Sequence, residues 1–152
     1  MANRVPMEEM YPLIEEMLNK NGTVSITVVG QSMQPMLYNL RDTVTLIKPA
    51  GPLKKYDLPF FRTDEGKFIL HRVIKINHDK SYECRGDNCW KSENNIRDEQ
   101  IIGIVKSFVR DGKTIFVDRS VGYWFYSRTW KFFHPFKKYH KYYVMIKNKL
   151  KF

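Results

Sequence analysis

Cysteine and long hydrophobic runs are scarce in this sequence, and its last 32 positions contain no acidic residue. Two cysteines, Cys84 and Cys89, are too few for a disulfide-rich secreted scaffold. No run of about 18 apolar residues occurs, so no membrane-spanning helix is expected. The first 20 residues carry four glutamates and no continuous apolar stretch, unlike a secretory signal peptide. We therefore expect a cytoplasmic protein.

The positive charge is confined to the C-terminal end. Residues 121–152 hold eight Lys or Arg and no Asp or Glu. Subtracting these eight from the net charge of +10 leaves +2 for the first 120 residues, which is a nearly balanced body. The chain is long enough for one domain with a hydrophobic core, and its 43% apolar and 28% charged residues are typical of a globular protein. An acidic partner would therefore meet the C-terminal segment.

The pattern of apolar residues predicts one helix followed by many short strands. Residues 7–19 have helical spacing and end before Asn21-Gly22. Strands are expected at 23–28, 42–47, 58–62, 67–76, 81–85, 100–110 and 113–117, with hairpins at 63–66 and Asp111-Gly112. We expect a mainly β domain with a curled or barrel-like antiparallel sheet, an N-terminal helix and an aromatic, basic C-terminal extension. The expected division is 1–22, 23–118 and 119–152.

A serine follows the first expected strand, in a loop that opens with glycine. Glycine permits the unusual backbone of a tight loop, and such a loop can present a hydroxyl at the end of a strand. Most serines in this position are ordinary turn residues, and a hydroxyl becomes a nucleophile only beside a base. Ser32 is therefore a candidate nucleophile whose chemistry depends on what lies next to it.

Three separated motifs resemble those of the type I signal peptidases and their relatives, the self-cleaving SOS repressors. Gly30-Gln31-Ser32-Met33-Gln34-Pro35 resembles the nucleophile motif, His71-Arg72-Val73 the base motif of the archaeal and endoplasmic-reticulum branch, and Gly86-Asp87-Asn88 the acid motif. The segment Lys55 to Arg62 resembles the strand between the first two motifs. The resemblance covers roughly residues 23–110 and implies the catalytic core of a signal peptidase. It implies Ser32 as nucleophile, His71 as general base and Asp87 as the acid that orients it.

Several positions depart from the family pattern, among them Cys89 and Trp90 in a stretch that is often more polar. Gly30 stands where some leader peptidases have a serine that donates to the oxyanion, and Glu93 stands where the archaeal branch often has a second aspartate. The usual N-terminal membrane anchor is replaced by the acidic helix, so cleavage of ordinary secretory precursors is less expected.

No cofactor is expected. His71, His78, Cys84 and Cys89 do not have the spacing of a structural zinc site, so no metal is expected either.

The C-terminal segment has three open interpretations. Residues 121–152 contain twelve aromatic residues interleaved with the eight basic ones. Aromatic rings and cations suit docking to an anionic membrane surface, which we rank first and which would bring the protein to the inner face of the membrane. Covering an apolar face of the domain ranks second, and nucleic-acid binding, which is not expected, ranks third.

The sequence thus supports two main hypotheses for function. The first is a serine endopeptidase that cleaves a precursor or leader peptide through an acyl-enzyme. The second is a catalytically inactive peptide- or membrane-binding module of the same fold. A regulator like the SOS repressors is a third, but residues 1–21 are too short for a helix-turn-helix domain.

Overall fold

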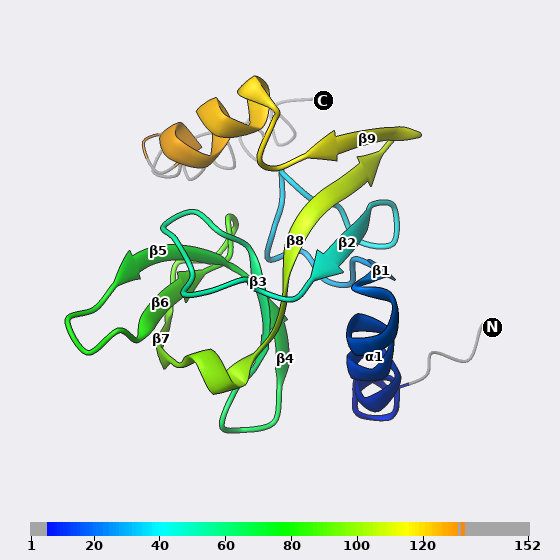
Figure 1. Cartoon of the computed structure of the whole chain (residues 1–152). Helices are drawn as coiled ribbons and strands as arrows, with labels where there is room; N and C mark the ends of the chain where they lie inside the picture. Colours follow the sequence, from blue (N-terminus) through cyan, green and yellow to red (C-terminus); the bar gives the residue numbers. More distant parts are fainter. Residues whose placement is uncertain (1–5, 131, 133–152) are drawn as a thin grey trace, which may run out of the picture. The chain divides into compact units, whose positions relative to one another are not determined.

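The computed structural model describes residues 6–130 and residue 132. The chain divides after Ser120 into two compact units, residues 1–120 and 121–152, which are described separately. In its described residues, 6–120, the first unit contains one α-helix, a short 3-10 helix (Asp98–Gln100) and nine strands in the order shown in Figure 1. In the second unit, residues 121–130 are helical.

The N-terminal helix, α1 (Met7–Asn21), has the expected amphipathic pattern. Ile14 and Leu18 are buried, whereas the glutamates between the apolar positions are exposed. The helix ends at Gly22, whose φ of 72° is the left-handed conformation that glycine adopts at little cost. The prediction of this helix and its end is confirmed.

The strands form two antiparallel sheets. Their bounds are β1 (Thr23–Thr27), β2 (Thr43–Ile47), β3 (Pro59–Arg62), β4 (Phe68–Leu70), β5 (Arg72–Ile76), β6 (Tyr82–Arg85), β7 (Glu93–Ile96), β8 (Ile101–Arg110) and β9 (Lys113–Phe116). The larger sheet has the order β1-β2-β8-β3-β4, with β9 also paired to β8, and the smaller has the order β5-β6-β7. The mainly β, antiparallel prediction is confirmed, and the described residues form no closed barrel.

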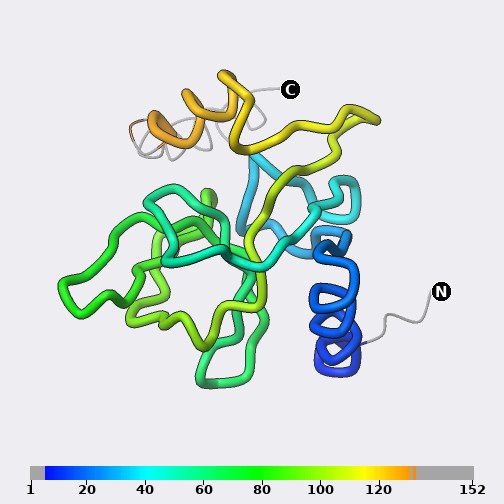
Figure 2. The backbone as a smooth tube through the Cα atoms, viewed as in Figure 1, coloured from blue at the N-terminus to red at the C-terminus, as the bar shows by residue number. Residues whose placement is uncertain are grey.

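The segment expected to be one strand over residues 67–76 is two strands. It breaks at His71: β4 pairs with β3 in the larger sheet, and β5 pairs with β6 in the smaller one. The chain therefore crosses from one sheet to the other at His71, and Figure 2 shows this path of the backbone. The prediction of a continuous strand is wrong because the apolar run on both sides of His71 is divided between two different sheets.

A shared core joins the two sheets. Buried Leu53, Phe61, Val73, Tyr82, Cys84 and Ile96 form one cluster. Because Phe61 belongs to β3 and Val73 to β5, this cluster holds the strands on either side of His71 in a fixed arrangement. The hairpin at Asp111-Gly112 forms as predicted, with positive φ at both turn residues.

Candidate active site

Ser32 lies in the loop that connects β1 to β2. The base of this loop is closed by two backbone hydrogen bonds, from Val28 N–H to the Asp42 carbonyl (2.9 Å) and from Leu40 N–H to the Val28 carbonyl (2.8 Å). The Gly30 N–H donates to Asn39 Oδ1 at 2.9 Å across the loop. These contacts fix the loop before and after Ser32.

The backbone around Ser32 has the features that the sequence predicted. Gly30 has a φ of 97°, which lies in the region that favours glycine, and a methyl group added to its Cα would meet nothing within 4 Å. The positive φ, rather than a lack of space, is therefore the reason for a glycine at position 30. Met33 is buried beneath the loop, and the Gln34–Pro35 peptide bond is cis. Ser32 itself is half-buried, so its side chain remains open to a ligand.

A buried carboxylate supports the far end of the same loop. Asp42 is fully buried and accepts hydrogen bonds from the Tyr38 N–H (2.9 Å) and the Arg41 guanidinium (2.7 Å). Burial, the largest single influence, raises the pKa of Asp42, but the hydrogen bonds and the two nearby arginines together lower it below its ordinary value. Asp42 is thus a buried charged residue that holds the Ser32 loop through hydrogen bonds, a role that its place in an expected strand did not reveal.

His71 is buried where β4 passes into β5. Its side chain is 6% exposed, and its ring lies edge-on to Phe61 with centroids 6.5 Å apart. Burial lowers the pKa of His71 to about 4, against the opposing effect of the Asp87 negative charge. The imidazole is therefore neutral at pH 7 and able to accept a proton.

The Gly86-Asp87-Asn88 loop is hydrogen-bonded directly to the Ser32 loop. The Asn88 N–H donates to the Ser32 carbonyl at 2.7 Å, and Asn88 Nδ2 donates to the Gln31 carbonyl at 3.2 Å. A methyl group at position 86 would lie 2.5 Å from the Ser32 carbonyl oxygen and 2.9 Å from His71 Nε2. The Ser32 carbonyl oxygen and His71 Nε2 therefore both lie next to Gly86, although the two residues are far apart in the sequence. No side chain fits at position 86 between them.

Asp87 lies beside these residues but is bonded to Arg72. The Arg72 guanidinium donates through Nε and Nη2 to the two Asp87 carboxylate oxygens, both at 2.8 Å, and both side chains are fully buried. The hydrogen bond expected from His71 to Asp87 is not formed, because His71 Nδ1 is buried without a hydrogen-bond partner among the described residues. Asp87 therefore acts on His71 through its charge, which favours the protonated imidazole.

Arg72 links all three motif regions. Besides Asp87, its guanidinium donates to the Met36 sulfur at 2.9 Å, in the Ser32 loop, and to the Tyr56 carbonyl at 3.4 Å. Sequence reasoning missed this role, because it treated Arg72 only as a neighbour of His71. The position of Arg72 directly before the apolar pair Val73-Ile74 was the available signal, since an arginine buried with them needs a buried partner.

A groove opens beside Ser32 and His71. Its volume is about 320 Å³, and apolar side chains from β1, β2, β3 and β4 of the larger sheet contribute to its walls. The lining includes Ile26, Val28, Val44, Phe60 and Leu70. Because Ser32 and His71 belong to the same lining, a ligand in this groove would meet both.

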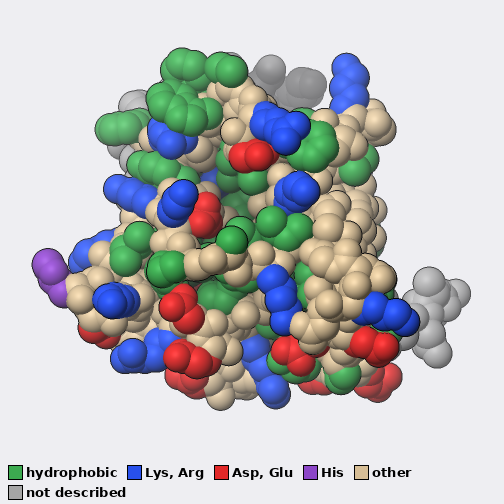
Figure 3. All heavy atoms as spheres, in the orientation of Figure 1, with side chains coloured by type: hydrophobic (Ala, Val, Ile, Leu, Met, Phe, Trp, Pro, Cys, Tyr) green, Lys and Arg blue, Asp and Glu red, His purple; other side chains and the backbone are tan. Residues whose placement is uncertain are grey.

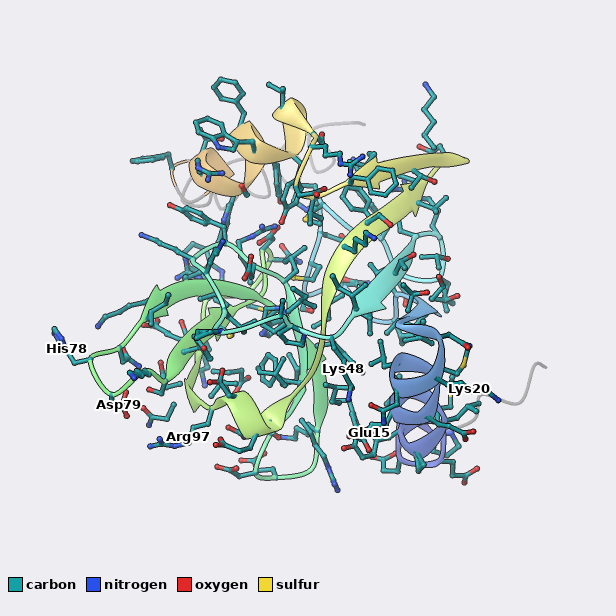
Figure 4. The ribbon with its side chains drawn as sticks, in the orientation of Figure 1. Glu15, Lys20, Lys48, His78, Asp79 and Arg97 are labelled. Atoms are coloured by element: carbon teal, nitrogen blue, oxygen red, sulfur yellow. The ribbon has the colours of Figure 1, made fainter. Side chains whose placement is uncertain are left out.

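The remaining polar candidates lie elsewhere or have other partners. Glu93 is on β7 opposite Cys84, and its negative charge raises the pKa of the Cys84 thiol. The pKa of His71 is instead set by burial and by the charge of Asp87. Burial raises the pKa of Cys84 to about 12 and also raises that of Cys89, so neither is a thiolate nucleophile at neutral pH. His78 is exposed at the tip of the β5–β6 turn (Figure 4). Within residues 6–130 and 132, no group of three His, Cys, Asp or Glu side chains is placed to hold a metal.

The buried imidazole predicts a pH-dependent stability. The folded protein binds a proton at His71 only near pH 4, whereas the unfolded chain binds one below about pH 6.5. The unfolded state therefore holds more protons between these values, and stability rises with pH in this window, by at most about 3 kcal/mol. Urea unfolding at pH 4.5, 5.5 and 7 should show a smaller rise for His71→Asn than for the wild type. Equal slopes for the two proteins would contradict the burial of a neutral imidazole.

Comparisons with protein-family models, with curated proteins and with solved structures gave no match for this chain.

Proposed function

We propose that this protein is a serine endopeptidase with Ser32 as nucleophile and His71 as general base, on a fold like that of the signal peptidase core. The observation that carries the proposal is the convergence of the Ser32 backbone and His71 Nε2 on Gly86, beside an apolar groove that both residues line. Residues 32, 71 and 86 belong to three separate motifs, and the fold brings them to one place.

The proposed reaction is acyl transfer through an ester intermediate. The Ser32 oxygen attacks the peptide carbonyl while neutral His71 takes the hydroxyl proton, and the resulting imidazolium then gives that proton to the leaving amine. Water, deprotonated by the same imidazole, hydrolyses the ester and frees the serine. The Asp87 charge stabilises the imidazolium, and the Ser32 N–H is our candidate donor to the oxyanion.

The substrate class follows from the groove and from the resemblance. Apolar walls favour a short apolar stretch of an extended peptide, and the family resemblance adds a small residue at the cleavage site. A dedicated precursor or leader peptide fits this description. We therefore propose a processing peptidase.

A comparison of matched serine variants tests the proposal. Wild type, Ser32→Ala and Ser25→Ala are incubated with a library of precursor-derived peptides, and new termini are identified by mass spectrometry. Ser25 is the control because its hydroxyl lies on β1 against Thr45, away from the groove lining. We expect cleavage by wild type and Ser25→Ala and none by Ser32→Ala, with His71→Ala equally inactive. Cleavage that survives in Ser32→Ala, or that is absent from all the proteins, would refute the peptidase.

The unpartnered Nδ1 of His71 favours a second candidate, an inactive peptide-binding module. A general base is usually oriented by a hydrogen bond at its other nitrogen, and the described residues form no such bond. In that case wild type and Ser32→Ala would bind a groove-filling apolar peptide with the same affinity, and neither would cleave it. Calorimetric titration of both proteins with one peptide separates binding from turnover.

A further inference from the structure

The helical segment 121–130, with Phe132 beyond it, presents an exposed apolar stripe. Val121 is 71% exposed, Trp124 49%, Phe125 57% and Phe132 74%. These positions follow the spacing i, i+3, i+4 and i+11, so in a helix they lie on one face. Arg128, at i+7, belongs to the same face. Figure 3 shows hydrophobic side chains gathered on this helical segment, which follows β9 in the chain.

The aromatic side chains of the stripe are arranged edge to face. The Trp124 and Phe125 rings are 5.0 Å apart at an interplanar angle of 79°, and the Arg128 guanidinium lies 4.2 Å from the centre of the Trp124 ring. A cation therefore covers one face of the indole, and the second ring meets it at a steep angle. The Trp124 and Phe125 rings are therefore not a parallel pair on which successive nucleic-acid bases could stack.

The charge of the surrounding sequence is of one sign. Residues 121–152 carry eight Lys or Arg and no Asp or Glu, so the segment attracts an anionic surface. The same charge opposes contact between two copies of this segment. Exposed tryptophan and phenylalanine beside cations are the side chains that bind at the headgroup level of a bilayer. No helix in the described part of the chain is long and apolar enough to cross a membrane.

We propose that the stripe of Val121, Trp124, Phe125 and Phe132 docks the protein on an anionic phospholipid surface by inserting at the headgroup level. Arg128 reaches the lipid phosphates from beside the Trp124 ring, and the other cations of the segment add long-range attraction. This docking is independent of the peptidase, because it uses no residue of the Ser32 site.

Vesicle binding by full-length Ser32→Ala tests the proposal without interference from proteolysis. The protein is sedimented with vesicles of phosphatidylcholine alone and with vesicles in which about a third of the lipid is phosphatidylglycerol. We expect binding to the anionic vesicles that weakens as salt is raised. Adding Trp124→Ser and Phe125→Ser should lower the partition coefficient by about tenfold or more, because both side chains leave water on docking.

The matched control is Trp90→Ser, which removes an exposed tryptophan from the body of the protein (64% exposed). We expect its binding to stay within about twofold of the parent, because residues 121–152 are unchanged. Circular dichroism and urea unfolding establish that each variant is folded. Equal partition onto neutral and anionic vesicles, or unchanged binding in the double variant, would overturn the proposal. Binding to single-stranded DNA without binding to vesicles, or dimerisation without lipid that the double variant abolishes, would also overturn it.

Discussion

Replacing Gly86 by alanine is expected to abolish peptide cleavage and to lower the free energy of unfolding by about 2–3 kcal/mol. The added methyl group would lie 2.5 Å from the Ser32 carbonyl oxygen and 2.9 Å from both His71 Nε2 and Cys89 Sγ. The Ser32 carbonyl cannot retreat freely, because it accepts the 2.7 Å hydrogen bond from the Asn88 N–H. The Ser32 loop and His71 must therefore separate, and a displacement of about 1 Å in such a site can cost on the order of 100-fold in rate.

Two other glycines separate this effect from the general cost of removing a glycine. Gly51 has an open environment and no positive φ, so Gly51→Ala should change neither stability nor cleavage. Gly112 also has open space but a φ of 74°, so Gly112→Ala should cost about 1 kcal/mol without slowing cleavage. Urea unfolding and cleavage rates measured on the three variants give the comparison. Near-wild-type cleavage by Gly86→Ala would show that Ser32 and His71 do not need the contact at Gly86.

Local patterns in the sequence were sufficient for most of the larger sheet. The alternation in residues 23–28 predicts β1, whose Val24 is buried, and Asp111-Gly112 predicts the β8–β9 hairpin. Both signals act between residues that are close in the chain. A short alternating strand and a two-residue turn need no distant partner to be recognised.

The third strand of the smaller sheet, β7, was not predicted, because it depends on pairing with residues distant in the sequence. β7 contains two asparagines, which are poor strand formers, and it exists because Tyr82 pairs with Ile96 and Cys84 with Glu93. Helical structure at residues 121–130 was also not predicted, because aromatic residues there suggested a surface segment without fixing its conformation. Pairing with β6 decides the structure of β7. In residues 121–130 the helical spacing of the apolar residues was the signal that was not used.

In the candidate site, too, some features were predicted from short sequence motifs and others depend on contacts between distant residues. Motif resemblance predicted Ser32, His71 and Asp87, and the structure places all three around Gly86. It implied that Asp87 would bond His71, whereas the carboxylate bonds Arg72, because aspartate accepts equally well from an imidazole or a guanidinium. The bidentate geometry and complete burial of Arg72 decide this, and they depend on a residue fifteen positions away.

Breaking the Arg72–Asp87 pair from either side is expected to destabilise the protein by about 3–5 kcal/mol. Arg72→Met leaves the Asp87 carboxylate buried without its guanidinium, and Asp87→Asn leaves a buried cation whose bidentate partner has lost its charge. The double variant removes both charges and should cost far less than the two single changes together. Urea unfolding of the four proteins gives the coupling energy. Simple additivity of the two changes would contradict a strongly coupled buried pair.

The same four proteins distinguish the two ways in which Asp87 can contribute to the proposed catalysis. If Asp87 acts mainly by holding Arg72, and through it the Ser32 loop at Met36, both single variants lose activity together with stability, and the double variant regains part of each. If the Asp87 charge on His71 dominates, the double variant regains stability but keeps a low cleavage rate, with the lower limb of its pH–rate profile shifted to lower pH. Arg97→Met, which breaks an exposed pair with Asp79 (3.5 Å, Figure 4), is the control and should cost less than about 1 kcal/mol. The contacts of Arg72 with three segments favour the first outcome, because they place a structural demand on Asp87 that the Coulomb interaction with His71 does not.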